Sequence, residues 1–284
     1  MRKHIQFILF TAVSIFTAVI LYSHFGKKPE HVVFPISVGI LTHYAPKTLR
    51  HTLESYKRSG FLDVVEDVFV VLQKSDRQIQ EIEVCSSFHL RHIVMPDNGA
   101  MSSGFQAIYN HAKKDTILFL ENDFSIQVSK QEVIDFLSNA MYFLHVEGCD
   151  YVRGRSRKYP GSPNIAYTEW KDLPPQTFLR EHGDFLSESI YWDPTPEKTY
   201  PSQIQRVNPI VGSEPWYCSL AKHCNYTNNP FVCRRSFFQQ AILPHLKFGE
   251  GIEGRLMPIW AKQNYLCVFG PGLFTHDRSY DGHW

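Results

Sequence analysis

The sequence predicts an α/β domain whose mostly parallel sheet is flanked by helices. Stretches rich in β-branched and aromatic residues alternate with stretches of helical spacing between residues 35 and 269, an order typical of parallel strands joined by short crossovers. At the centre, residues 116–120 (TILFL) are β-prone without alternation, as in a strand buried on both faces of a sheet. The 284 residues, 43% hydrophobic and 20% charged, are enough for one such domain.

Local composition predicts the individual elements. Apolar, β-prone runs predict strands at 35–42, 67–72, 89–95, from 116 onward, at 150–153 and at 265–269. Apolar residues at helical spacing predict helices at 46–59, 102–112, 131–146, 236–243 and 251–262. Residues 159–209 are rich in proline, aromatic and charged residues, which predicts long loops of the kind that carry function in a compact domain.

The central strand ends in two carboxylates, Glu121 and Asp123. Open α/β sheets bind their ligands beyond the carboxyl ends of their strands. Carboxylate oxygens are hard donors, suited to a divalent cation that also holds a diphosphate. An acidic turn after a strand is the alternative, since two acids at this spacing are common. The order of the surrounding elements favours the metal site.

The charge balance gives no sign of nucleic-acid binding. The chain has 29 Lys and Arg against 28 Asp and Glu, a net charge of +1, so it has no bulk positive field. A phosphoryl-transfer or hydrolytic enzyme on a doubly wound sheet is disfavoured, because neither a G-x-S-x-G nor a Walker-type loop is present.

An apolar segment precedes the domain. Residues 5–22 carry no charge and lie between Arg2-Lys3 and Lys27-Lys28, and their length exceeds that of a usual signal-peptide core. We expect a cytoplasmic tail at 1–4, a transmembrane signal anchor at 5–22, a short stem at 23–34 and a lumenal catalytic domain at 35–284. A cleaved signal peptide is the alternative.

Two further features agree with a lumenal position, in the Golgi or the endoplasmic reticulum. Asn225-Tyr226-Thr227 is an N-glycosylation sequon. The six cysteines are even in number, which permits pairing in an oxidising compartment. The clustering of Cys218, Cys224 and Cys233 favours at least one bridge among them. Paired C-x-x-C spacings are missing, so a zinc site is not expected.

Short motifs in a fixed order resemble those of a known family. They are Thr42-His43-Tyr44 after the first strand, Asn98-Gly99 with Ser102-Ser103-Gly104 at a helix start, the hydrophobic run that ends in Glu121-Asn122-Asp123, Asn229-Pro230-Phe231, and Glu250-Gly251-Ile252-Glu253 upstream of His276. This order resembles the GT-A fold nucleotide-sugar glycosyltransferases, particularly the large inverting family typified by cellulose and chitin synthases. The resemblance spans roughly residues 36–278.

The resemblance implies a donor site with Mn²⁺ or Mg²⁺. Asp123 would bind the metal directly, and Glu121 would act through water or the ribose. His276 would be the third ligand, since several GT-A enzymes close the metal site with a C-terminal histidine. A loop histidine that only hydrogen-bonds is the alternative. The residues matched to the nucleotide-sugar site are Thr42, His43, Asp76, Asn98, Ser103, Gly104 and Asn122.

An inverting displacement also needs a general base for the acceptor hydroxyl. Glu250 and Glu253 are three positions apart, so they share one face at the start of a helix. Gly251 replaces the acid that the family usually carries, which makes Glu253 the preferred base and Glu250 the next candidate. One of the two would only cap the helix or complement its dipole.

Polar and aromatic residues of the later segments are the acceptor candidates. Asn229 offers an amide for sugar hydroxyls, and Trp216 offers a ring face for stacking. The basic run from Arg153 to Lys158 is interpreted mainly as a solvated face.

Together these observations predict a single-pass, lumenal, metal-dependent glycosyltransferase. It would move a sugar from a nucleotide-sugar, with a UDP-sugar as the expected donor, to a glycan or glycoprotein with inversion. The alternative is a catalytically inactive lumenal binding protein on the same fold. Gln73 and Gly251 favour that alternative, because both stand where the family usually has acids.

Overall fold

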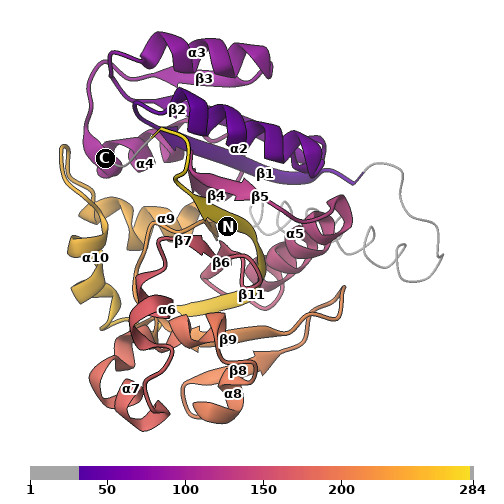
Figure 1. Ribbon diagram of the computed structural model, residues 1–284, viewed down its shortest axis with the longest axis vertical. Helices are drawn as coiled ribbons and strands as arrows, with labels where there is room; N and C mark the ends of the chain where they lie inside the picture. Colours follow the sequence, from indigo (N-terminus) through magenta and orange to yellow (C-terminus); the bar gives the residue numbers. More distant parts are fainter. Residues whose placement is uncertain (1–31, 282–284) are drawn as a thin grey trace, which may run out of the picture.

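The computed structural model describes residues 32–281. Within them, an 11-stranded mixed sheet has the order β3-β2-β1-β4-β10-β6-β11-β9-β8, and β5 and β7 pair with β11 beside this path. Figure 1 shows the strands passing through the middle of the molecule, with α2 lying across β1. The predicted α/β architecture is confirmed.

The first half of the described chain alternates strands and helices. Its strands, which pair in parallel, are β1 (Phe34–Thr42), β2 (Val65–Leu72), β3 (Arg91–Val94) and β4 (Thr116–Glu121). Its helices are α2 (Pro46–Arg58), η1 (Phe61–Asp63), α3 (Gln78–Ser87) and α4 (Ala100–His111). The sequence pattern misses α3, because two of its buried residues are Glu81 and Cys85 rather than large apolar side chains.

Strand β4 is buried on both faces, as predicted. Leu118 and Leu120 belong to a core cluster shared with α2 and α5, whereas Ile117 and Phe119 belong to a second cluster shared with α4, α9 and α10. Burying a large apolar side chain contributes roughly 1.5–3 kcal/mol. Two independent cores therefore hold the strand that ends in Glu121.

The second half of the described chain completes the sheet. Its strands are β5 (Phe124–Ile126), β6 (Tyr151–Arg155), β7 (Gly161–Ser162), β8 (Ile204–Val207), β9 (Trp216–Leu220), β10 (Phe231–Arg234) and β11 (Leu266–Asp277). Its helices are α5 (Lys130–His145), α6 (Ile165–Trp170), α7 (Pro175–Glu181), η2 (Gly183–Tyr191), α8 (Pro196–Thr199), η3 (Ala221–His223), α9 (Arg235–Ala241), η4 (Leu243–His245) and α10 (Glu253–Trp260).

The prediction of mostly parallel pairing fails in the second half of the chain, where β5 and β9 run antiparallel to β11, β8 runs antiparallel to β9, and a further reversal occurs at β10. This strand lies between β4 and β6 and runs antiparallel to both. The chain leaves β6 at its carboxyl end and returns to the same edge of the sheet, so β10 begins where its neighbours end. As a result, Asn229 and Pro230 lie at the ligand-binding edge of the sheet.

The prediction of long loops at 159–209 is wrong. Short helices α6, α7, η2 and α8 fill most of this segment. The α-helices are 4 to 7 residues long, too short for an apolar period to be visible. Their starts are set by capping chemistry instead: Asn164 caps α6 through its side chain, and prolines open α7 and α8.

The expected anchor at 5–22 lies outside the described residues, as do the tail at 1–4 and most of the stem. Among residues 32–281, no helix is long and apolar enough to cross a membrane.

The expected bridge among the clustered cysteines is wrong, because all six cysteines are free thiols. Cys233 on β10 and Cys218 on β9 are separated by β6 and β11. Neighbouring strands lie about 4.8 Å apart, so these two residues are out of disulfide range. The Cys224 thiol donates instead to the Leu220 carbonyl, 3.2 Å away.

A buried carboxylate fastens the amino-terminal strands to one another. Asp67 on β2 accepts hydrogen bonds from the Ser37 hydroxyl (2.7 Å) and the Lys113 amide (3.3 Å) through Oδ2, and from Arg91 (2.9 Å) through Oδ1. Burial would raise the pKa of Asp67, but these bonds and the Arg91 charge outweigh it, so the pKa lies below its ordinary value of 3.8.

We predict that Asp67→Asn lowers the free energy of unfolding by about 1–3 kcal/mol at pH 7. A depressed pKa gives stability that is complete above the ordinary pKa and is lost as the pH falls below it. The difference between variant and wild type should therefore shrink between pH 7 and pH 3 in urea titrations. Asp63→Asn is the control, since the Asp63–Lys130 pair is mostly exposed. An equal loss at both pH values would contradict this account.

Candidate functional site

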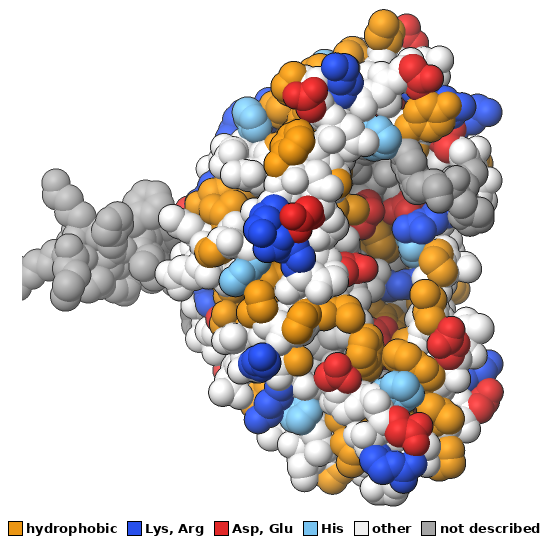
Figure 2. Space-filling model, turned by 90° about the vertical axis from the view of Figure 1, so that its left-hand side faces the viewer, with side chains coloured by type: hydrophobic (Ala, Val, Ile, Leu, Met, Phe, Trp, Pro, Cys, Tyr) orange, Lys and Arg blue, Asp and Glu red, His pale blue; other side chains and the backbone are white. Residues whose placement is uncertain are grey.

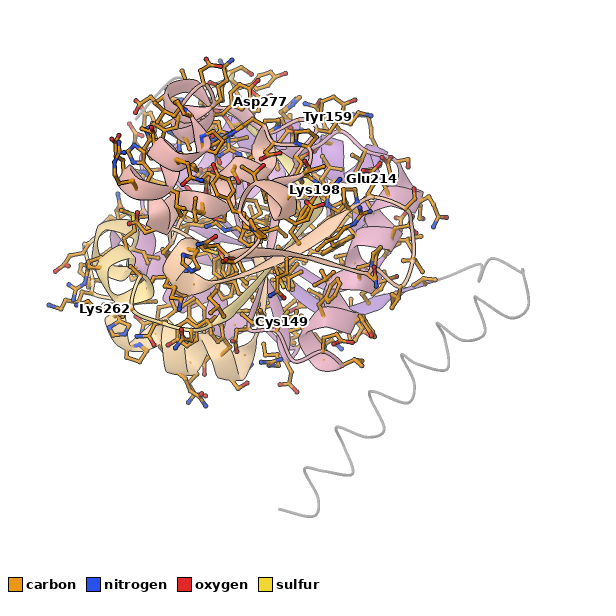
Figure 3. All side chains as sticks on the ribbon, turned by 90° about the horizontal axis from the view of Figure 1, so that it is seen from below. Cys149, Tyr159, Lys198, Glu214, Lys262 and Asp277 are labelled. Carbon is orange, nitrogen blue, oxygen red and sulfur yellow. The ribbon has the colours of Figure 1, made fainter. Side chains whose placement is uncertain are left out.

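The candidate site lies where the residues that follow β4 meet the end of β11. Strand β5, which follows Asp123, pairs antiparallel with β11 and sets Phe124 opposite His276. The Asp277 amide donates to the Asp123 carbonyl at 2.7 Å. In Figure 3 Asp277 lies on the opposite side of the molecule from Cys149, which precedes β6 at the other edge of the sheet.

Asp123 is the centre of the site. Its Oδ2 lies 3.0 Å from His276 Nε2 and 2.9 Å from Arg278 Nε. Burial would raise the pKa of Asp123, but the hydrogen bonds and charges of His276 and Arg278 outweigh it, so the pKa lies below its ordinary value. Asp123 is therefore a carboxylate at neutral pH.

The Asp123–His276 pair fits a divalent cation. Their facing atoms are 3.0 Å apart, the separation of neighbouring ligands that are each about 2.1 Å from one octahedral ion. Asp123 Oδ1 is buried without a hydrogen-bond partner, a costly arrangement for a carboxylate oxygen. Between residues 32 and 281, no three or more His, Cys, Asp or Glu side chains gather to share an ion. Phosphate oxygens and water would complete the coordination, as is common for Mg²⁺.

Glu121 does not join this pair as a third ligand. Burial raises the pKa of Glu121 well above its ordinary value, and the charges of Asp123 and Glu253 add to this effect while Arg278 opposes it. A carboxyl group in such surroundings favours its protonated form. Glu121 therefore lies beside the site, and its expected role through water or the ribose stays a prediction.

The two acids near the start of α10 have different surroundings. Glu253 accepts a hydrogen bond from the Asn228 amide at 2.7 Å, and its charge acts on Glu121, so it lies on the site side. Glu250 pairs with Arg255, and this hydrogen bond lowers the pKa of Glu250. Figure 2 shows that the face carrying α10 and α4 is hollowed, with acidic and basic side chains inside the hollow.

The predicted nucleotide-sugar residues separate into two groups. Four are buried and serve the fold: Thr42, Ser103, Gly104 and Asn122. A Cβ at Gly104 would lie 2.4 Å from the Leu41 side chain, so glycine is needed there for α4 to pack on β1. The other three are at least partly accessible: His43 and Asn98, whose side chains are 3.1 Å apart, and Asp76. Only this second group offers polar atoms to a donor.

Sequence reasoning misses Glu81, which lies beneath this region. Its buried Oε1 accepts the Thr42 hydroxyl at 2.7 Å and the Ala45 amide at 3.1 Å. Burial raises the pKa of Glu81, although both hydrogen bonds oppose the rise. Glu81 fixes the turn between β1 and α2. A glutamate in an unrecognised helix gives no signal in the sequence.

Of the two predicted acceptor residues, only Asn229 is at the site. Trp216 is 1% exposed and packs between the rings of Phe136 and Phe143, at 5.5 and 5.2 Å. It faces the α5 side of the sheet, so the prediction of a stacking role for Trp216 is wrong.

Two other predictions about surface residues are also wrong. Asn225 is 9% exposed rather than a surface residue, and its Oδ1 is buried without a hydrogen-bond partner. Arg153 and Arg155 are buried rather than solvated. Arg153 donates to the Asn225 carbonyl and lies 3.7 Å from buried Glu188. Both differences from the predicted exposure arise because the segment of residues 156–230 folds back over β6.

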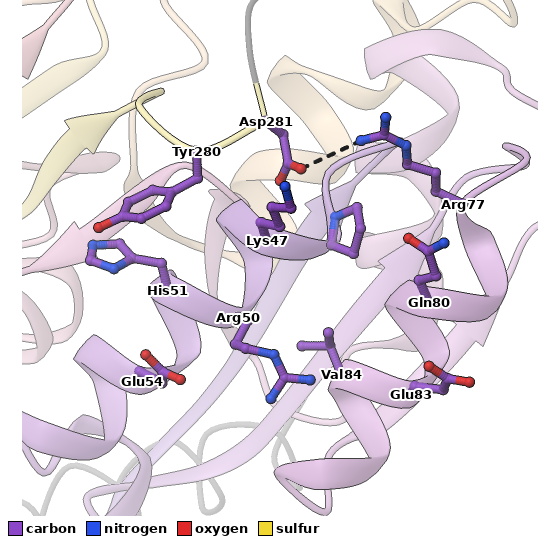
Figure 4. A pocket seen from close by; sticks show the side chains of 11 residues that line it. Lys47, Arg50, His51, Glu54, Arg77, Gln80, Glu83, Val84, Tyr280 and Asp281 are labelled. Carbon is purple, nitrogen blue, oxygen red and sulfur yellow. Dashed lines mark hydrogen bonds and ion pairs between the residues drawn. The ribbon is translucent and has the colours of Figure 1, made fainter.

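The C-terminal segment is fastened to helix α2 (Figure 4). Asp281 Oδ2 accepts the Thr48 amide at 2.6 Å and its hydroxyl at 3.0 Å, Asp281 Oδ1 lies 3.5 Å from Arg77, and the Tyr280 ring stacks on His51 at 4.3 Å. These contacts border a groove of about 700 Å³ between α2 and α3. They hold the segment that begins with His276 and Arg278.

Comparisons with solved structures identify the fold. S. aureus TarS (residues 1–349) superposes with a TM-score of 0.50 at 15% identity, over 86% of this chain and 60% of that one. The mannosyltransferase PcManGT from Pyrobaculum calidifontis, solved with GDP-Man and Mn²⁺, superposes with a TM-score of 0.50 at 13% identity, over 96% of this chain and 69% of that one. The fold is therefore GT-A, as the motif order predicts. The sequence itself matches no family model and no curated protein.

We predict that Asp281→Ala destabilises the protein by about 0.5–2 kcal/mol, because it removes the acceptor that caps the first turn of α2. Thermal unfolding measures the effect. Glu83→Ala is the matched control, since Glu83 is an exposed acid that lines the same groove. An Asp281→Ala variant as stable as the control would show that the docked segment contributes nothing.

Proposed function

We propose that this protein is a metal-dependent glycosyltransferase that moves a sugar from a nucleotide-sugar to a hydroxyl acceptor. The observation that supports it most directly is the pairing of Asp123 with His276 at the carboxyl end of β4. On a GT-A fold, this is the edge where a sheet of this kind binds its ligand.

Asp123 and His276 are the residues that would hold Mn²⁺ or Mg²⁺, and Glu121 stands behind them. When bound, the metal would act as a Lewis acid on the diphosphate of the donor. Arg278 adds a guanidinium next to Asp123, which suits the negative charge that develops on a departing nucleoside diphosphate.

Glu253 is the proposed general base of an inverting transfer. The acceptor oxygen would form a bond to the anomeric carbon while the bond from that carbon to the diphosphate breaks. The acceptor proton would pass to Glu253, and the electron pair of the broken bond would leave with the nucleoside diphosphate. Glu250 is less suited, because its ion pair with Arg255 lowers its basicity.

The finer parts of the proposal rest on the sequence. A UDP-sugar is the proposed donor and a glycan or glycoprotein the proposed acceptor. Residues 5–22 are proposed to anchor a lumenal domain in the Golgi or endoplasmic reticulum membrane. Protease treatment of intact vesicles tests this last part: a domain digested without permeabilisation would be on the cytoplasmic side.

The purified protein, incubated with Mn²⁺ and a panel of UDP- and GDP-sugars, should hydrolyse or transfer one donor. We expect Asp123→Ala to abolish this turnover, since it removes the central carboxylate. EDTA should do the same and Mn²⁺ should restore it. If the folded wild type binds none of the donors in thermal-shift titrations, the enzyme proposal fails and a binding protein on the same fold remains.

Glu253→Gln should lower the transfer rate by about 10²–10⁴-fold, with little change in donor binding. Glu250→Gln is the matched control, and its rate should stay within a few-fold of wild type because its carboxylate is engaged by Arg255. Measured kcat values that fall for Glu250→Gln and not for Glu253→Gln would reverse the assignment of the base.

A further inference from the structure

Arg155, at the carboxyl end of β6, is a buried cation that the proposed reaction does not use. It is 6% exposed. Its Nε donates to the Pro160 carbonyl at 2.8 Å, its Nη2 to Pro163 at 2.7 Å and to Gly161 at 3.4 Å, and its Nη1 to Asn229 Oδ1 at 3.2 Å. The planar guanidinium group therefore holds the backbone of residues 160–163 and the side-chain amide of Asn229 in one fixed arrangement.

One of these carbonyls also contacts the metal-site histidine. His276 Nδ1 lies 3.3 Å from the Pro163 oxygen. A carbonyl has two lone pairs and no proton to give, so it can accept from Arg155 and His276 together. His276 then carries a hydrogen on Nδ1, and its Nε2 lies 3.0 Å from Asp123 Oδ2. A metal-binding histidine is commonly oriented in this way, by a hydrogen bond from its other ring nitrogen.

The same loop lies against the backbone of His276. Gly161 is in register with His276 between β7 and β11. A Cβ at Gly161 would be 2.0 Å from the His276 carbonyl oxygen, so the approach requires glycine. On the ring itself, Phe124 stacks at a centroid distance of 4.8 Å and limits tilting. Rotation of the ring about the bond to Cβ is limited by the Pro163 carbonyl at Nδ1 and by Asp123 Oδ2 at Nε2.

We propose that Arg155 is a positioning residue for the metal site: it holds the Pro163 carbonyl against His276 Nδ1, so that His276 Nε2 faces Asp123. The link to metal binding rests on the proposed function, whereas the orientation of the imidazole does not. Through Nη1, Arg155 also fixes Asn229 with its amide oxygen turned inward, which leaves the amide nitrogen as the donor on the acceptor side.

Lysine should not replace this arginine. A lysine ammonium is a point charge without the rigid fork, so it cannot bridge Pro160, Pro163 and Asn229 in one geometry. Arg157, two residues after Arg155 and just beyond the end of β6, is the matched control. Its Nε donates to the Ile190 carbonyl at 2.8 Å and its guanidinium lies over the Tyr217 ring at 4.9 Å, so it is bonded to a different loop.

The first measurement is the protonation pattern of His276, read from long-range ¹H–¹⁵N NMR spectra of the full-length protein. His276→Ala identifies the signals. We expect a hydrogen on His276 Nδ1 in the wild type, partial loss of that hydrogen in Arg155→Gln and Arg155→Lys, and the wild-type pattern in Arg157→Gln. A wild-type imidazole that lacks hydrogen on Nδ1 would overturn the inference without any variant having to fold.

The second measurement is Mn²⁺ affinity, from the electron paramagnetic resonance signal of free Mn²⁺ titrated with full-length protein. Arg155→Gln and Arg155→Lys should weaken binding by about 10- to 100-fold, and Arg157→Gln should not. If His276→Ala weakens binding but the Arg155 variants do not, the positioning role is wrong. If His276→Ala itself has no effect, the metal assignment of the proposed function is wrong, and the NMR result still decides what Arg155 does.

Discussion

The candidate site depends on one pairing, that of β5 with β11. Asp123 and His276 are 153 positions apart in the sequence, and the antiparallel pairing of the residues beside them brings the two side chains into contact. The hydrogen bond from the Asp277 amide to the Asp123 carbonyl fixes the register. Without this pairing, Asp123 would lie in an acidic turn with no histidine beside it.

The other candidate groups lie near Asp123 because β10 runs antiparallel to both of its neighbours in the mixed sheet. Strand β10 begins at the edge where β4 and β6 end, so the Asn229 amide faces the same region as Asp123. Helix α10 then packs through Leu256 and Trp260 against the core on that side of the sheet. Glu253, at its first turn, reaches the Asn228 amide. The candidate site thus combines Asp123 from the first half of the chain with Asn229, Glu253 and His276 from the second.

Buried arginines, rather than apolar side chains, fill the space around the edge of the sheet where β6 ends. Removing a guanidinium from water is costly unless its donors are satisfied, and Arg155 meets that condition with three carbonyls and one amide oxygen. Arg153 satisfies it partly, with the Asn225 carbonyl, the Thr227 hydroxyl and nearby Glu188. A segment rich in proline has few amides to pair its carbonyls, so arginine donors suit it well. The hydrogen bonds of these two arginines therefore hold loops that lack regular structure in one conformation.

The sequence by itself determined the elements whose signals are local. The unbroken apolar run of β4, the periodic faces of α2 and α5, and the acidic residues that end β4 can each be read within a few positions. They were enough to predict an α/β domain, and the order of the short motifs added the resemblance to the GT-A fold. Only the tertiary structure decided which long-range partners meet. Trp216 and Asn225 have the residue types of a sugar contact and a glycan site, yet folding buries both. Glu81 and Arg155 look like solvent-facing charges, yet folding encloses them. Burial depends on which segments cover a residue, and that is fixed by pairings such as β5 with β11 that no local pattern encodes.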